Sequence, residues 1–263
     1  MFSLSRRTFL LSSSAAALAG CATSVRDGAS FPGGAAAQAR AAYDAIFDQL
    51  LAASPETATQ LGLDTGARAG LKSRLSDPTP AGRLGQYRPI VDALPRLRAI
   101  DATRLAGRER GWLSTAIWFG ERGAEFDSIP WGSARGYPAP YILSQLTGSY
   151  QSLPEFLDTQ HRIETEADAS AYLDRLDAFH RAVDAEVEAA RSDAGRGVMP
   201  PAFIIDKARS QTRTLLGEKG SKSALVRSLV RRTREKGLAG DWEERAASTS
   251  ASTARWKASS RSR

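Results

Sequence analysis

The chain has 263 residues, of which 42% are hydrophobic and 25% charged, and its formal net charge is +7. This composition is typical of soluble proteins, and the length suffices for one large domain or two small ones. The single cysteine excludes an internal disulfide, so a hydrophobic core alone must hold the fold.

The excess positive charge lies at the C-terminal end. Residues 221–263 contain 11 Lys and Arg against 4 Asp and Glu, whereas the other 220 residues contain 25 of each. A nucleic-acid-binding domain usually carries its basic residues on a folded face, interleaved with aromatic residues. The distribution therefore disfavours a nucleic-acid partner.

The first residues have the pattern of an export leader. Residues 9–20 form an uncharged run of twelve residues, whereas a bilayer-spanning helix needs about 20 apolar residues. A positive start, a short apolar middle and small residues at the end are typical of a secretory signal. The alternative is a buried N-terminal helix.

Two motifs make the leader more specific. The run SRRTFL at residues 5–10 resembles the twin-arginine export signal, although Leu11 stands where Lys is often found. The run LAGC at residues 18–21 resembles the lipobox of bacterial lipoproteins. These resemblances imply a signal peptide at 1–20, recognised through Arg6, Arg7, Phe9 and Leu10.

The lipobox resemblance further implies that Cys21 is acylated and anchors the exported chain to a membrane of the cell envelope or periplasm. The implied partners are the twin-arginine export machinery, the lipoprotein-processing enzymes and the membrane itself. The alternative for Cys21 is an unmodified thiol in a discarded leader. Residues 22–34 are small and polar, and they predict a tether between the lipid and the fold.

Short helices are predicted after the tether. The spacing of apolar residues predicts one helical face in residues 35–54, formed by Tyr43, Ile46, Phe47, Leu50 and Leu51. Ser54 and Pro55 predict a second helix start. Residues 64–82 resemble a loop, and two prolines predict short or kinked helices over 84–97.

A longer helix is predicted over residues 103–120, with Leu105, Trp112, Ala116 and Phe119 on one side. The next stretch, residues 129–156, contains four prolines and three glycines. That content predicts an irregular, aromatic-rich segment rather than a long helix.

The clearest helix is predicted to begin after Thr165, which forms a capping-box pattern with Asp168. The acidic residues of this helix are expected on its solvated face, with Arg175 and Arg181 nearby for pairing along the helix. The acids are Asp174, Asp177, Asp184, Glu186 and Glu188. Further helices are predicted over 202–216 and from a Ser221 cap to Gly237. No alternating strand pattern is present, so the predicted fold is all-α, an irregular helical array.

Residues 246–263 have a different composition from the rest of the chain. Of these 18 residues, 13 are Ala, Ser or Thr, and none is Leu, Ile, Val, Met or Phe. Such a segment predicts a disordered basic tail. Its abrupt beginning suggests a shifted reading frame, with a tail for anionic surfaces as the alternative.

The sequence offers little catalytic chemistry. It has two histidines, no HExxH pair and no P-loop. His180 is expected at a helix boundary, and the pairing of His161 with Asp158 is expected to be a chance spacing. No catalytic residue, metal ligand or cofactor is predicted for this chain.

Three segments resemble one bacterial family, the domain of unknown function 885. They are SPETATQLGL at 54–63, the block from 137 to 179 that begins YPAPYILSQLTGSYQ, and GVMPPAFIIDK at 197–207. The resemblance covers residues 40–245. It implies a helical protein about twice this long, similar to zinc-dependent peptidases, whose metal motif lies in a C-terminal half.

That motif does not occur in this chain, so the resemblance implies zinc and a peptide-like substrate for full-length members only. The expectation is a chain truncated before its metal site, with a helical domain at 35–245. Tyr137, Tyr141 and Gln145 are expected to line one wall of the substrate cleft, or to pack the irregular segment internally. The alternative function is a self-sufficient helical binding or scaffolding lipoprotein.

Overall fold

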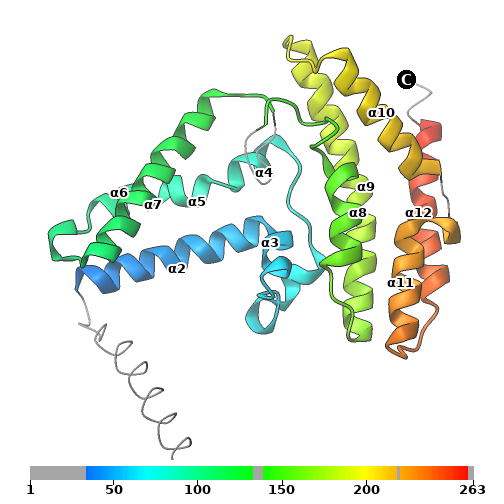
Figure 1. Cartoon of the computed structure of the whole chain (residues 1–263), viewed down its shortest axis with the longest axis horizontal. Helices are drawn as coiled ribbons and strands as arrows, with labels where there is room; N and C mark the ends of the chain where they lie inside the picture. Colours follow the sequence, from blue (N-terminus) through cyan, green and yellow to red (C-terminus); the bar gives the residue numbers. More distant parts are fainter. Residues whose placement is uncertain (1–33, 133–138, 218–219, 260–263) are drawn as a thin grey trace, which may run out of the picture.

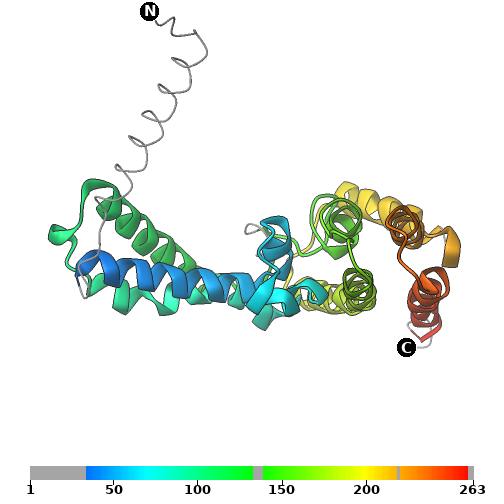
Figure 2. The same ribbon diagram turned by 90° about the horizontal axis from the view of Figure 1, so that it is seen from below.

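The computed structural model describes residues 34–132, 139–217 and 220–259. Within these ranges the chain forms α-helices and short 3₁₀ turns and no β-strand, which confirms the all-α prediction. The molecule is elongated, and its two halves form two lobes joined by a narrow junction (Figure 1; Figure 2).

The N-terminal lobe consists of one long helix on each side of several short ones. Its helices are α2 (Ala35–Ala53), α5 (Arg88–Asp92), α6 (Leu94–Arg98) and α7 (Gly107–Glu125), with the 3₁₀ turn η3 (Ala102–Arg104) before α7. Pro89 and Pro95 each lie in the first turn of a short helix, as expected of prolines. The buried core of this lobe is Ala35, Ala39, Ala42, Ile46, Ala93, Leu97, Ile100, Leu105 and Leu113.

The side of α7 that carries its large aromatic residues is not its most buried side. Trp112 and Phe119 are 54% and 55% exposed, whereas Leu113, Gly120 and Gly123 are buried. A Cβ atom at Gly120 would lie 2.7 Å from the Leu94 side chain. The helix therefore turns its small residues inward, where they permit close packing on α5 and α6, and leaves its large aromatic residues outside.

The junction contains the short helices α3 (Pro55–Gln60) and α4 (Pro80–Gly85) and the 3₁₀ segment η2 (Gly66–Ser73). Buried Leu51, Ala58 and Leu71 form a small core there. The 3₁₀ segment packs directly on α9 of the other lobe. Lys72 of η2 also donates to Asp168 of α9 across 2.6 Å, so polar contacts reinforce this joint.

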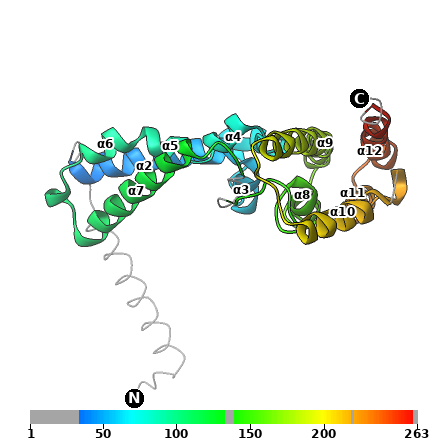
Figure 3. The same cartoon turned by 90° about the horizontal axis from the view of Figure 1, so that it is seen from above.

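The C-terminal lobe is a set of longer helices. They are α8 (Ser149–Thr159), α9 (Glu166–Gly195), α10 (Ala202–Gly217), α11 (Ala224–Glu235) and α12 (Trp242–Ser259), with η5 (Gly220–Lys222) before α11. Figure 3 shows α8 and α9 nearly end-on, with α10 running across them. The predicted capping box is confirmed, since Thr165 and Asp168 each accept the other's main-chain N–H. The N-cap of α11 is Ser223 rather than the predicted Ser221.

Helix α12 continues through much of the segment that the composition predicted to be disordered. It packs on α9 and α11, and Ala246 is completely buried in the main core of the lobe. A small side chain at this position lets the helix approach its neighbours closely without a large apolar residue. Composition alone therefore underestimated how far the fold extends. Among the described residues, no helix combines the length and apolar character of a membrane span.

Candidate functional site

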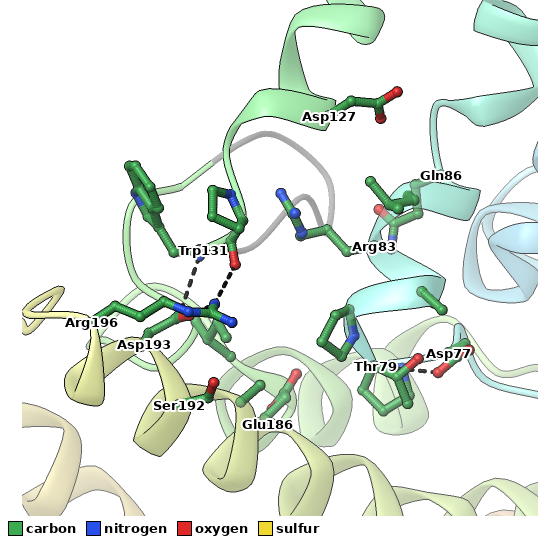
Figure 4. Close-up of a pocket in the computed structure, with 18 of the residues that line it drawn as sticks. Asp77, Thr79, Arg83, Gln86, Asp127, Trp131, Glu186, Ser192, Asp193 and Arg196 are labelled. Atoms are coloured by element: carbon green, nitrogen blue, oxygen red, sulfur yellow. Dashed lines mark hydrogen bonds and ion pairs between the residues drawn. The ribbon is translucent and has the colours of Figure 1, made fainter.

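A cavity of about 630 Å³ lies where the N-terminal side of α4 faces the second half of α9 (Figure 4). The segment that follows α7 and the 3₁₀ turn η4 (Phe126–Ser128) forms a third wall. Its lining mixes cations, acids and one large aromatic ring, represented by Arg83, Arg88, Asp127, Trp131 and Arg196. It is therefore a polar cavity with both signs of charge.

Two residues at the end of α9 hold the third wall in place. The buried carboxylate of Asp193 accepts the main-chain N–H of Gly132 at 3.0 Å, and the Arg196 guanidinium donates to the Pro130 carbonyl at 2.7 Å. Gly132 has a φ of +81°, which favours glycine. A Cβ there would also lie 2.4 Å from the Ala139 carbonyl oxygen. The wall thus depends on both the glycine and the α9 side chains.

A third α9 residue, Glu186, lies deeper in the cavity. Its carboxylate accepts the main-chain N–H of Ser149 at 2.7 Å and the Ser149 hydroxyl at 2.8 Å. The first of these bonds satisfies the main-chain N–H at the start of α8, a helix that follows Gly148, whose φ is +105°. Glu186 is 4% exposed, so its assignment to a solvated face was wrong.

The opposite side of the cavity is held by two arginines. Arg88 forms a paired contact with the Asp127 carboxylate, with both N–O distances at 3.1 Å. Arg83 donates to the Ile129 carbonyl at 2.8 Å. Figure 4 shows Arg83 pointing from α4 across the cavity mouth toward the Trp131 segment. Side chains from both lobes therefore fix the shape of the cavity.

A second polar cluster lies in the junction, around a fully buried Arg175. Its guanidinium donates to the Thr59 hydroxyl at 2.7 Å, the Arg74 carbonyl at 2.9 Å and the Leu71 carbonyl at 3.1 Å. It also lies 4.9 Å from the centre of the Phe156 ring. This is the opposite of the solvated, acid-paired position predicted for Arg175, whereas Arg181 does pair with Asp177 as expected.

The same guanidinium contacts His161, which is 1% exposed. Arg175 lies 2.9 Å from Nδ1 of the imidazole, and Nε2 lies 3.0 Å from the Asp168 carbonyl oxygen. An arginine can only donate, so Nδ1 accepts and the proton of the neutral ring resides on Nε2. Asp158 instead accepts from Ser228, so it does not form a His–carboxylate pair with His161.

Burial controls the protonation of this cluster. Burial lowers the pKa of His161 to about 4, and the nearby cations Arg175, Arg232 and Lys72 act in the same direction. Burial also lowers the pKa of Arg175 to about 10. At neutral pH the pair is thus a neutral imidazole and a charged guanidinium. The imidazole accepts a hydrogen bond from the guanidinium in this state, and the contact is kept within the junction.

The described residues contain no group of three or more His, Cys, Asp or Glu side chains placed to hold a metal ion. In the cavity, Asp193 and Glu186 both accept main-chain N–H groups. Both carboxylates therefore hold the walls of the cavity in place.

The predicted cleft residues lie in or beside the irregular segment before α8. Tyr141 and Gln145 are half-buried; the Tyr141 carbonyl accepts from Thr147 at 3.1 Å, and the Gln145 carbonyl from Gln211 at 3.4 Å. The described lining of the cavity includes their neighbour Ile142. Tyr137 lies outside the described residues, and their role in a cleft stays a prediction.

The proposed leader residues Arg6, Arg7, Phe9, Leu10 and Cys21 also lie outside the described residues. The α9 residues that hold the cavity are not among the predicted site residues. A signal for them existed, because Phe179, Ala182, Glu186, Ala189 and Asp193 follow one another at alternating spacings of three and four. That spacing continues the core-facing stripe of the helix.

Comparisons with known proteins agree with the fold. A family model described as "Bacterial protein of unknown function (DUF885)" matches residues 55–260. The crystal structure of a "putative lipoprotein from Colwellia psychrerythraea" superimposes with a TM-score of 0.65 at 16% sequence identity. The match covers 83% of this chain and 37% of that one, so the chain spans less than half of its neighbour's length. No curated protein matches.

Proposed function

Because the chain belongs to the DUF885 family of bacterial proteins of unknown function, we propose that it is an exported, lipid-anchored envelope protein that binds a peptide-like ligand. The leader motifs support the export and the anchor, with Cys21 as the acylated residue. The structural neighbour described as a lipoprotein supports the same location.

The chemistry of the cavity lining supports the proposal that the ligand is a peptide. A peptide presents amide groups, charges of both signs and apolar side chains. The cavity offers Arg83 as a cation, Asp77 as an anion and the 38% exposed Trp131 as an apolar surface. Its walls are fixed by buried hydrogen bonds to α9, which reduces the ordering cost of binding.

The family resemblance extends this proposal to longer members. There the same fold would form one wall of a zinc-dependent peptidase, with the metal held by residues that this chain does not contain. Acting alone, the chain would bind peptides without cleaving them. Purified protein incubated with zinc and a peptide library should give no metal-dependent products, and their appearance would contradict this part.

Peptide binding is tested at Trp131. We expect Trp131→Ala to weaken the binding of fluorescently labelled peptides by about tenfold, because Trp131 is the largest apolar side chain in the described lining of the cavity. Fluorescence polarisation measures the change. Trp118→Ala, which removes an exposed tryptophan outside the cavity lining, is the matched control. Equal affinities for both variants would exclude this cavity as the peptide site.

A scaffolding role is the second candidate. It is favoured by the use of Glu186, Asp193 and Arg196 as internal clamps, since residues used in this way are not available for a ligand. In that case no peptide of the library should bind, while the protein should still be found in the envelope and be labelled with palmitate at Cys21. Loss of that labelling in Cys21→Ser tests the anchor separately.

A further inference from the structure

Helix α7 presents an unpartnered stripe on the outside of the N-terminal lobe. The exposed residues Arg108, Trp112, Thr115, Phe119 and Arg122 follow at spacings of four, three, four and three, which places them on one face. We call these five residues the α7 stripe. Its aromatic residues are about half exposed, so a large apolar surface faces outward.

A further aromatic residue widens the stripe. Trp118 is 54% exposed, and its ring lies edge-on to Phe119 with the ring centres 5.1 Å apart. Tryptophan and phenylalanine on an exposed helix, with cations beside them, are the composition of a helix that lies on a lipid surface. An isolated exposed apolar residue needs no explanation, but three on one helix do.

The charges around the stripe complement an anionic surface. Residues 94–125, which cover α6, η3 and α7, contain six arginines against four acids. Three of the acids are already paired, Glu109 with Arg40, Glu121 with Arg98 and Glu125 with Arg122. Arg108 and Arg122 end the stripe, and long arginine side chains can reach headgroups while the rings between them enter the interface.

The position of the stripe points to a membrane. Ala35 and Ala39, in the first turns of α2, share a core with Leu105 and Leu113. The chain that leads back to Cys21 therefore enters the lobe beside the start of α7. Residues 22–34 could span at most about 45 Å even if fully extended, so an acylated Cys21 would keep this lobe close to the bilayer.

A second copy of the chain fits the stripe less well. An antiparallel pair of α7 helices centred on Thr115 would place Arg108 of one copy against Arg122 of the other. A parallel pair would place each arginine against its own equivalent. Both arrangements bring like charges together at the ends of the contact, which is unfavourable.

We propose that the α7 stripe and Trp118 form a membrane-binding surface that rests on anionic phospholipid. This rests on the proposed lipid attachment, which would bring the surface to the bilayer and add to its binding. The acyl chain and the stripe would together hold the N-terminal lobe against the membrane, since two weak membrane contacts bind far more strongly than one.

The test uses the full chain with Cys21→Ser, so that no acyl group contributes. Its sedimentation with vesicles of phosphatidylethanolamine and phosphatidylglycerol is compared with that on phosphatidylcholine alone. We expect binding to the anionic vesicles only, with a shift of tryptophan emission to shorter wavelength. Adding Trp112→Ser, Trp118→Ser and Phe119→Ser together should weaken binding by at least about tenfold.

Two further variants make the test specific. Phe203→Ser removes a 60% exposed aromatic residue on α10 and should leave binding unchanged. Arg108→Ala and Arg122→Ala should each weaken binding by about fivefold. Circular dichroism confirms that each variant is folded.

Three results would overturn the proposal: no binding to anionic vesicles, binding that survives the triple substitution, or a dimer in solution that the triple substitution abolishes. A failure of lipid attachment would instead appear as absent palmitate labelling in cells. Vesicle binding by the unacylated chain would be unaffected, so the two failures are distinguishable.

Discussion

At the residue scale, the most informative pair is His161 and Arg175. Histidine beside a charged residue suggests acid–base chemistry, but here both side chains are buried and the imidazole accepts from a cation. The ring edge also meets Tyr172, with the ring centres 5.4 Å apart. The contacts of this histidine are those of a structural hydrogen-bond acceptor.

This arrangement predicts a specific pH dependence of stability. The pKa of His161 is about 4 in the folded protein, against an ordinary value of 6.5. The unfolded chain therefore binds more protons between these values, and the free energy of unfolding falls as the pH drops from 6.5 toward 4. The expected loss is about 3 kcal/mol, measured by urea denaturation across this range.

The matched variant for this prediction is His161→Gln, which keeps an acceptor but cannot titrate. Between pH 6.5 and 4 its free energy of unfolding should lack the loss that protonation of His161 causes, although other groups still titrate. The charged groups that face the imidazole are Arg175, Arg232 and Lys72, and all oppose its protonation. Parallel pH profiles for the two proteins would show that another group is responsible.

The register of α9 could be derived from its apolar residues, and the roles of its charged residues could not. The stripe that includes Tyr172 and Phe179 predicts which face is buried, and Arg175 and Glu186 lie on that same face. Their assignment to solvent followed from residue type alone. What the sequence does not reveal is the partner, because Thr59 and Ser149 lie on other elements.

At the scale of single elements, α7 shows why periodicity can mislead. Leu105, Trp112, Ala116 and Phe119 do follow a helical spacing, but the packed face is the one that carries Gly120 and Gly123. Close approach of α5 and α6 requires small residues, and a hydrophobicity pattern gives glycine little weight. Helix starts at Pro55 and Glu166 were easier to predict, because prolines and capping residues act locally.

Helix α12 supplies a second prediction. Ala246→Asp places a carboxylate in the main core of the C-terminal lobe and should destabilise the protein by about 2–4 kcal/mol. Ser248→Asp, two residues on at an exposed position, should change stability by less than about 0.5 kcal/mol. Urea denaturation compares the two variants.

Equal effects of these substitutions would show that α12 does not dock on α9 and α11, as the composition of residues 246–263 suggested. A large difference would show that the last helix belongs to the folded domain. The buried indole of Trp242, whose Nε1 donates to the Ala239 carbonyl at 3.0 Å, anchors the start of the same helix.

At the scale of the whole molecule, the two lobes have separate cores. Among the described residues, their junction combines a small apolar cluster with the Arg175 hydrogen bonds and the Lys72–Asp168 pair. The all-α class could be predicted from the sequence, but the division into two lobes could not, since it depends on contacts between distant segments.

Arg175→Met should therefore uncouple the lobes. Removing the guanidinium takes its donor from the buried Thr59 oxygen and one of two donors from the Leu71 carbonyl, at a cost of about 2–4 kcal/mol. We expect unfolding in urea to separate into two transitions, followed by tryptophan fluorescence and by circular dichroism. Arg181→Met, on the exposed side of the same helix, should leave a single transition.

If Arg175→Met lowers stability but both lobes still unfold in one cooperative transition, contacts other than the Arg175 hydrogen bonds suffice to join the lobes. The cavity gives an independent readout, because α4 and α9 form opposite sides of it. Peptide binding should be lost in Arg175→Met before either lobe unfolds.

The guanidinium of Arg175 also has a kinetic consequence. Its hydrogen bonds join α9 to positions as much as 120 residues away along the chain. Closing so long a loop costs entropy before the contacts can form, so these bonds should be made after the main folding barrier. In that case the arginine contributes little to the speed of folding and much to the slowness of unfolding. The lifetime of the closed molecule, rather than the rate at which it first assembles, would then depend on one buried cation.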